Sequence, residues 1–497
     1  MEPLTRAEAT DWQETSRHAD VMAYVRALHD PRLHAIEIGR SPEGRELPLL
    51  VLSARGVTGP DEARAAGLPV VLVICGIHAG EVEGKEAGLM LARDLLRGAH
   101  PGILDRITLL LLPLYNPDGN DRIDPKNRAL DVAHCEGQIG PPGGVGTRGN
   151  AAGINLNRDY MRQEASESRL LCARVVVPWA PDLTIDCHAT DGSVHGFALT
   201  YDTAHTVESG RPEPIRFMRA ELLPEVTRRV RAASGRETFS YGNFVDDEGG
   251  PPGAEGWMTY PHHPRFGSNY RGLTSRMDLL LETYSYTPFE ERVRTTYEFL
   301  VETLRVAGER GANIRAIVDA SRSPRADIAV RYRLEADEAP VTIPTRRPRA
   351  LDGEPVSVTI PHLCRFIGTA VVRRPWAYAV PEAIARHIER HGLEVRALRE
   401  ARMAEVEVAR VKAAAAAAAA RRILEASEER EIEVDVRAES RLLPAGTWVV
   451  PTDQPLGAIA VYLCEARSDD GLVACGLVAE PAAGAEWPAL RVLAPLA

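Results

Sequence analysis

Residues 70–86, VVLVICGIHAGEVEGKE, set the first expectation for the fold. Six consecutive apolar residues are followed by Gly76, and one histidine and three acids then occur between His78 and Glu86. A short apolar run without polar alternation is typical of a strand that is covered on both faces of a sheet. The titratable residues therefore begin where a buried strand ends, and ligands of open α/β sheets bind at such strand ends.

Three more apolar runs of this kind follow, separated by helical patterns: ITLLLLPL (107–114), LTIDC (183–187) and MDLLLE (277–282). Buried strands that alternate with helices predict an α/β domain with a mixed, mostly parallel sheet flanked by helices on both faces. Upstream, residues 33–53 have the pattern of two strands joined by a Ser-Pro-Glu-Gly turn. A helix from about residue 290 to 320 is expected to close this domain.

The pattern changes after SRSPRAD (321–327), which has the composition of a linker. Short alternating segments follow it and indicate a β-rich α+β domain. We therefore predict a catalytic domain over residues 1–321 and an accessory domain over residues 326–497. Eight alanines at 413–420 are too few to cross a membrane, and alanine's helix propensity predicts a helical connector there.

The composition is that of a globular protein, with 44% hydrophobic and 26% charged residues among 497. Its net charge of -11 disfavours nucleic acid or an anionic membrane as the main partner. No run reaches the roughly 18 apolar residues of a membrane span, and the first twenty residues lack a signal-peptide core, so we expect a cytoplasmic protein. Seven scattered cysteines without a CxxC pair favour reduced thiols. The oligomeric state stays open.

Two histidines and two glutamates stand at the ends of predicted strands. His78 and Glu81 follow the first strand, His188 follows LTIDC, and Glu282 ends MDLLLE. If these strands are neighbours, His78, Glu81 and His188 form a His2Glu set that leaves one zinc position open. Glu282 then stands beside that position as a candidate base.

The HxxE spacing alone is weak evidence, because it occurs four times: His34/Glu37, His78/Glu81, His205/Glu208 and His391/Glu394. Only His78 follows a predicted buried strand and precedes a glycine-bearing turn into a helix. The third ligand also has competitors, namely His195, His262 and His263. A single histidine at a strand end is more often a hydrogen-bonded structural residue, so the joint arrangement carries the prediction.

Five motifs resemble, in order and spacing, those of the zinc carboxypeptidase family, the M14 metallopeptidases: HAGE (78–81), YNPDG (115–119), RGNAAGINLNRD (148–159), DCHATDG (186–192) and LLETYSY (280–286). The resemblance implies a zinc-dependent carboxypeptidase that cleaves the amide bond next to a free carboxylate. A zinc amidohydrolase that acts on a small, non-peptide or peptidoglycan-type amide is the alternative. A non-catalytic zinc-binding or peptide-binding module is a third hypothesis. The candidate base Glu282 argues against it, because a binding module needs no base.

The resemblance also implies one zinc ion per chain and a role for each matching residue. These are the zinc ligands His78, Glu81 and His188, the general base Glu282, the oxyanion partner Arg148, and the pair Asn157 and Arg158 that binds the substrate's carboxylate. A peptide or small amide with a free carboxylate is thus the expected partner.

Some positions depart from the family pattern or stay open. Asn155 stands where the family usually has an aspartate that orients a zinc-bound histidine, and an amide can still accept the imidazole N–H. Arg122 and Arg128 are rival oxyanion partners. Tyr260 and Tyr270 both qualify as the family's substrate-capping tyrosine. No residue is assigned to side-chain preference.

Overall fold

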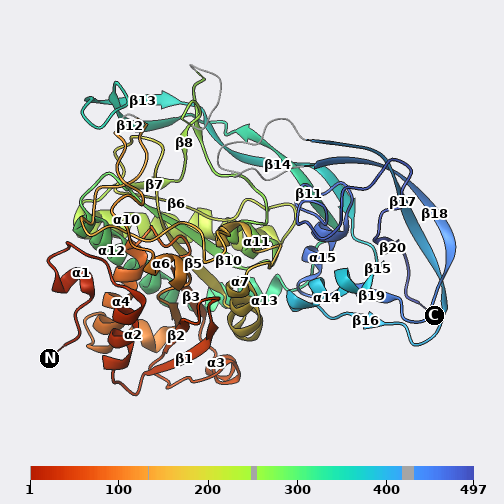
Figure 1. Cartoon of the computed structure of the whole chain (residues 1–497), viewed down its shortest axis with the longest axis horizontal. Coiled ribbons are helices and arrows are strands. Elements are labelled where there is room, and N and C mark those ends of the chain that lie inside the picture. Colours follow the sequence, from red (N-terminus) through yellow and green to blue (C-terminus); the bar gives the residue numbers. More distant parts are fainter. Residues whose placement is uncertain (1, 133, 248–253, 417–429, 497) are drawn as a thin grey trace.

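The computed structural model of the protein describes residues 2–132, 134–247, 254–416 and 430–496 (Figure 1). The N-terminal part of the chain forms an eight-stranded sheet. The strand order is β1-β2-β4-β3-β5-β10-β6-β7. The strands are β1 (Leu33–Arg40), β2 (Glu46–Leu52), β3 (Val70–Cys75), β4 (Thr108–Leu112), β5 (Leu183–Ala189), β6 (Leu199–Asp202), β7 (Thr238–Ser240) and β10 (Met277–Thr283). The central strands β4, β3, β5 and β10 run parallel, and β1 and β2 add an antiparallel edge. The predicted mixed sheet is confirmed.

Side chains alternate between the two faces along each buried strand, so an uninterrupted apolar strand makes both faces apolar. Helices cover both of these faces. Val71 and Val73 pack into a core with α4, α10 and α12, whereas Leu72 and Ile74 pack into a second core with α7, α8 and α11. The α-helices up to residue 288 are α1 (Arg6–Ala9), α2 (His18–Ala27), α3 (Pro60–Ala66), α4 (Glu83–Leu96), α5 (Ile103–Arg106), α6 (Pro117–Asp121), α7 (Ser166–Leu171), α8 (Val177–Trp179), α9 (Pro212–Phe217), α10 (Leu223–Ser234) and α11 (Gly267–Leu273). η1 (Leu156–Arg158) is a 3-10 helix, and η2 (Cys172–Val176) and η3 (Met218–Leu222) are π-helical segments.

The closing helix predicted from about residue 290 to 320 is two helices, α12 (Phe289–Glu309) and α13 (Gly311–Ala320). Arg310 separates them because its backbone leaves the helical region, with φ -96° and ψ 12°. None of the helices within the described residues is long and apolar enough to cross a membrane.

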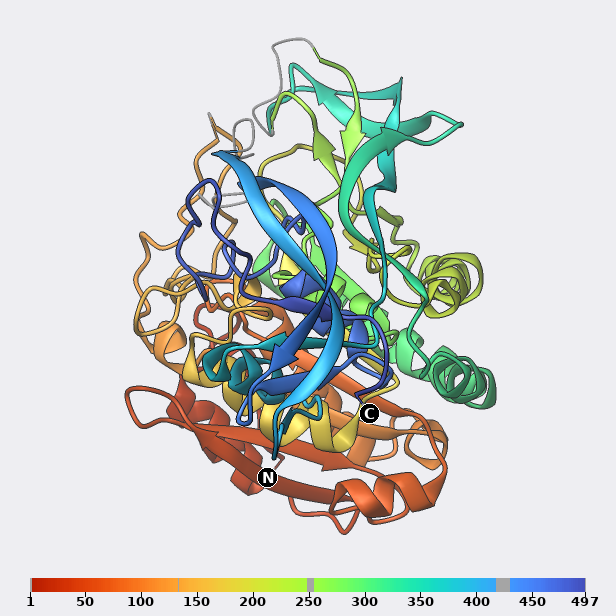
Figure 2. The same ribbon diagram turned by 90° about the vertical axis from the view of Figure 1, so that its right-hand side faces the viewer.

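The C-terminal part is rich in strands, as predicted, and its sheets are mainly antiparallel. Its elements are β11 (Asp327–Ala336), β12 (Val341–Arg347), β13 (Glu354–Ile360), β14 (His362–Arg373), β15 (Ala377–Val380), α14 (Glu382–Arg390), β16 (Arg396–Ala397), β17 (Arg402–Ala416), β18 (Arg430–Leu443), β19 (Trp448–Pro451), α15 (Gly457–Cys464) and β20 (Leu490–Val492). Figure 2, turned toward this part, shows β17 and β18 as a long twisted ribbon.

One sheet crosses the predicted boundary between residues 321 and 326. Its order is β11-β14-β9-β8, and the short strands β8 (Asn243–Phe244) and β9 (Trp257–Met258) come from the predicted catalytic domain. β9 runs parallel to β14, with Trp257 opposite His362. The two parts of the chain are therefore joined by backbone pairing, and the boundary itself stays a prediction.

The helical connector predicted at the eight alanines is wrong for residues 413–416. These alanines lie in β17, where Ala414 pairs with Ile432 of β18. Inter-strand hydrogen bonds to β18 outweigh the helix propensity of alanine, which is a difference of well under about 1 kcal/mol per residue. Residues 417–420 lie outside the described part of the chain.

Candidate active site

The order of the central strands brings the predicted site residues to one edge of the sheet. β5 lies between β3 and β10, with Cys187 opposite Cys75 on one side and His188 opposite Glu282 on the other. Residues opposite each other on parallel strands project from the same face. The sequence-based condition, that these strands are neighbours, is met.

The HAGE turn links β3 to α4 and places His78 and Glu81 on one side. Gly76 starts this turn with φ +67°, a conformation that favours glycine, and the Glu81 N–H donates to the His78 carbonyl at 3.0 Å. Gly84 then lets α4 approach β5, because a Cβ atom there would lie 2.4 Å from Cys187 Cβ. The sequence analysis did not assign a role to Gly84.

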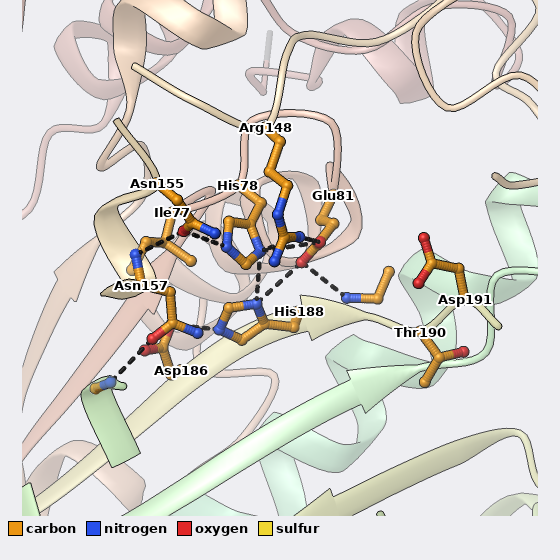
Figure 3. Close-up of polar contacts among 12 residues, drawn as sticks. Ile77, His78, Glu81, Arg148, Asn155, Asn157, Asp186, His188, Thr190 and Asp191 are labelled. Carbon is orange, nitrogen blue, oxygen red and sulfur yellow. Dashed lines mark hydrogen bonds and ion pairs between the residues drawn. The ribbon is translucent and has the colours of Figure 1, made fainter. Parts of the chain in front are cut away.

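Three candidate ligands meet at the centre of the site (Figure 3). His78 Nδ1 and His188 Nδ1 each lie 3.0 Å from a Glu81 carboxylate oxygen and 3.3 Å from each other. Ligand atoms around a tetrahedral zinc ion are separated by roughly 3.3 Å, because its bonds to nitrogen are about 2.0–2.1 Å long. All three side chains are buried. The donor set and its spacing therefore fit one zinc ion.

The outer nitrogen of each imidazole faces a side-chain oxygen, and Nδ1 faces the centre. His78 Nε2 lies 3.0 Å from the Asn155 side-chain oxygen, so an amide can fill the position of the usual aspartate. His188 Nε2 lies 3.3 Å from Asp186 Oδ1, and Arg271 donates to the other Asp186 oxygen at 3.0 Å. The sequence analysis missed Asp186, although its place two residues before His188 puts both side chains on one strand face.

Burial and neighbouring charges set the protonation of the ligands. Burial, together with Arg148, lowers the pKa of His78 to about 4, which keeps its imidazole neutral. Burial also opposes the charged forms of the other two ligands. Even so, Asp186 and Glu81 raise the pKa of His188 well above its ordinary value, and the two imidazoles hold the pKa of Glu81 well below its own.

All seven residues predicted from the sequence line one cavity of about 410 Å³: His78, Glu81, Arg148, Asn157, Arg158, His188 and Glu282. Burial is the main cause that raises the pKa of Glu282 to about 8, and the nearby Glu81 charge adds to it. A divalent cation among the three ligands would lower this pKa, because positive charge favours the carboxylate form.

The structure separates the three candidate oxyanion partners. Arg148 and Arg128 each place Nη1 near Glu81 Oε1, at 3.3 Å and 3.2 Å, and both line the cavity. Arg122 instead forms an ion pair with Glu43 at 2.7 Å, and it is not among the described residues that line the cavity. Two arginines therefore stay available for an oxyanion.

The tyrosines and the competing histidines are separated as well. Tyr260 lines the cavity and donates its hydroxyl to the Thr203 carbonyl at 2.9 Å, whereas the Tyr270 hydroxyl meets His391 Nδ1 at 2.8 Å. Tyr260 is thus the better placed of the two. The rival third ligands lie elsewhere: the His195 ring packs at a tilt against Tyr284, and His262 and His263 form a separate group with Asp469.

A known protein family matches part of the sequence. Residues 18–174 match the sequence profile described as zinc carboxypeptidase. This part of the chain is similar to the zinc carboxypeptidase family. The matched segment contains His78, Glu81, Arg148, Asn157 and Arg158, and His188 and Glu282 lie beyond it.

Individual zinc carboxypeptidases match over different lengths. Carboxypeptidase D of Mus musculus is 34% identical over 142 residues, which are 25% of this chain and 10% of that protein. The chain thus spans about a tenth of the length of that relative. Carboxypeptidase 2 of Trichophyton tonsurans is 21% identical over 490 residues, covering 91% of this chain and 81% of that protein. A metallo-carboxypeptidase structure from Burkholderia cenocepacia is similar over 58% of this chain and 68% of its own, with 19% identity and a TM-score of 0.41.

Proposed function

We propose that this protein is a zinc-dependent carboxypeptidase that hydrolyses the C-terminal peptide bond of peptides with a free carboxylate. The observation that carries the proposal is the triangle of His78 Nδ1, His188 Nδ1 and the Glu81 carboxylate, with sides of 3.0–3.3 Å, in a cavity that Glu282 also lines. When bound there, a zinc ion supplies a Lewis acid that polarises a carbonyl and acidifies water.

The protein's own residues supply the remaining parts of the reaction. Glu282 accepts a proton from the attacking water and returns it to the leaving amine. Arg148 donates to the developing oxyanion. Arg128, whose Nη1 contacts the same Glu81 oxygen as that of Arg148, is the second candidate donor. The Arg158 guanidinium, with Asn157 beside it on the cavity wall, holds the carboxylate of the substrate.

The first test replaces the proposed base. We expect Glu282→Gln to retain about one zinc per chain and to lose roughly 10²–10⁴-fold in kcat, the usual contribution of general base catalysis. Metal analysis and peptide hydrolysis measure the two quantities. Glu290→Gln, at a partly exposed ion pair with Arg294 on α12, is the control and should leave both unchanged. Unchanged hydrolysis in a zinc-loaded Glu282→Gln protein would remove the mechanism.

A substrate panel separates the proposal from its rivals. We expect hydrolysis of an acetylated tetrapeptide with a free C-terminus and little hydrolysis of its C-terminal amide, because Arg158 pairs with a carboxylate. Equal rates on both would favour a general amidohydrolase. No hydrolysis of any amide by the zinc-loaded protein would favour a binding module.

A further inference from the structure

The segment 261–267 joins the proposed carboxylate site to the C-terminal part of the chain. On its inner side, the Gly267 N–H donates to Asn157 Oδ1 at 2.9 Å. The Arg158 guanidinium lies over the Phe266 ring, 3.9 Å from its centre. Both side chains proposed to bind the substrate carboxylate therefore touch this segment directly.

On its outer side, the same segment is held by two consecutive aspartates that follow α15. Asp470 accepts the Arg265 backbone N–H at 2.6 Å and its Nε–H at 2.8 Å, and Arg265 Nη2 lies 2.7 Å away. Asp469 Oδ2 lies 2.7 Å from His262 Nε2, and the Tyr462 hydroxyl donates to Asp469 Oδ1 at 2.7 Å. These contacts span about 200 residues of sequence, as the separations of 205 and 207 positions show.

These two contacts are as buried as a hydrophobic core. Arg265 and Asp470 are each 1% exposed, and Asp469 is 2% exposed. Hydrogen bonds between charged groups in such surroundings are short, directional and costly to break on one side only. They therefore fix the backbone of the segment more firmly than surface ion pairs would.

We propose that Asp469 and Asp470 are positioning residues for the carboxylate site, because they fix residues 262–267 and thereby the places of Arg158 and Asn157. This proposal deepens the proposed function and rests on it. The C-terminal part thereby contributes to substrate binding, because side chains outside the predicted catalytic domain fix the positions of the residues that bind the terminal carboxylate. The aspartates touch neither the metal ligands nor Glu282 in any contact of the described residues.

Steady-state kinetics of the full-length, zinc-loaded protein test the proposal. We expect Asp470→Asn to raise KM for the free-carboxylate tetrapeptide about tenfold or more, since small misplacements of a binding group are costly. We expect kcat to change less than about twofold, and slow hydrolysis of the amidated peptide to be unaffected. A merely structural role would lower the yield of active protein without this split between KM and kcat.

Two further variants keep the test decisive if Asp470→Asn folds poorly because it leaves Arg265 without its charge partner. The double variant Arg265→Met/Asp470→Leu removes both charges and should show the same rise in KM.

Glu465→Gln is the matched control, because Glu465 is a buried carboxylate of the C-terminal part that accepts a hydrogen bond from the Tyr378 hydroxyl at 2.5 Å. It should leave KM unchanged. An equal KM rise in Glu465→Gln, or an unchanged KM in folded Asp470→Asn, would overturn the proposal.

A binding measurement keeps this result separate from failure of the proposed function. In the Glu282→Gln background, calorimetry with the free and the amidated tetrapeptide reports carboxylate binding without turnover. Weaker binding of the free peptide alone, on adding Asp470→Asn, supports the proposal even if the wild type hydrolyses no amide.

Metal analysis decides the remaining outcome, because His262, His263 and Asp469 place ligand atoms within 4.8 Å of one another. One zinc per chain supports an ion-pair contact. A second zinc that is lost in Asp469→Asn would overturn the proposal in favour of a metal site.

Discussion

At the scale of single residues, the two ligand imidazoles differ in the group that orients them. Asn155 accepts from His78 without a charge, whereas Asp186 faces His188 with a carboxylate that Arg271 also holds. A carboxylate behind a ligand histidine raises the basicity of that imidazole. The negative charge that the family usually places behind one histidine is here found behind the other.

Replacing that carboxylate should weaken metal binding. We expect Asp186→Asn to lower zinc affinity by about 10–100-fold, the usual cost of losing such a partner. Competition with a chromophoric chelator measures it. Asp182→Asn is the control, because Asp182 precedes the same strand and accepts from the Val70 N–H instead of a ligand histidine. Equal affinity in Asp186→Asn and the wild type would show that Asp186 does not support His188.

At the scale of elements, α4 is anchored to the N-terminal segment by charged groups inside the core. Glu86 accepts three hydrogen bonds from Thr15 and Ser16, and Lys85 donates to Asn120 at 2.6 Å and to the Ser16 carbonyl. Burial lowers the pKa of Lys85 to about 8. This helix starts two residues after Glu81, so its anchoring also holds the HAGE turn in place.

The lysine makes stability depend on pH in a defined window. The folded-state pKa of about 8 lies below the ordinary lysine pKa of 10.5, so the unfolded chain binds more protons between these values. The free-energy cost of burying Lys85 in its charged form is fully present below pH 8 and disappears as pH rises toward 10.5. Relative to Lys85→Met, the wild type should gain about 3 kcal/mol of unfolding free energy across this window. Urea unfolding of both proteins at several pH values measures the difference, and a constant difference would contradict it.

At the scale of the whole molecule, the two predicted domains share a core. The largest hydrophobic cluster contains Leu72 of β3, Tyr270 of α11, Ile388 of α14 and Trp487 near the C-terminus. α14 also reaches the segment that follows Arg158, where His387 Nε2 lies 2.9 Å from the Met161 carbonyl. Such contacts are those of one cooperative unit.

Cutting the chain between the predicted domains should therefore not separate them. We expect a specific protease site inserted after Arg322, which is exposed, to be cleaved while the two fragments elute together in size-exclusion chromatography. The uncut variant is the control. Two separately eluting, folded fragments would show that the boundary at residues 321–326 divides independent domains.

Predictions from the sequence succeeded for features with a local pattern and failed where a distant strand partner decides the structure. Apolar runs identified β3, β4, β5 and β10, because burial on both faces leaves a direct mark on a strand. The position of His78, Glu81, His188 and Glu282 after those runs predicted a common site, because parallel strands end at one edge. The alanines at 413–416 were misassigned, because a strand partner outweighs a weak helix propensity.

The sequence by itself thus predicted the sheet, the candidate metal ligands and the candidate base, since each depends on residue type and on distance from a strand end. Only the tertiary structure decided that Asp186 faces His188, that Arg128 joins Arg148 beside Glu81, and that Asp470 holds Arg265. These pairs depend on which hydrogen-bonding groups meet once the chain has folded. Arg265 and Asp470 are 205 positions apart and leave no periodic pattern in either segment, so no local pattern in the sequence reveals that contact.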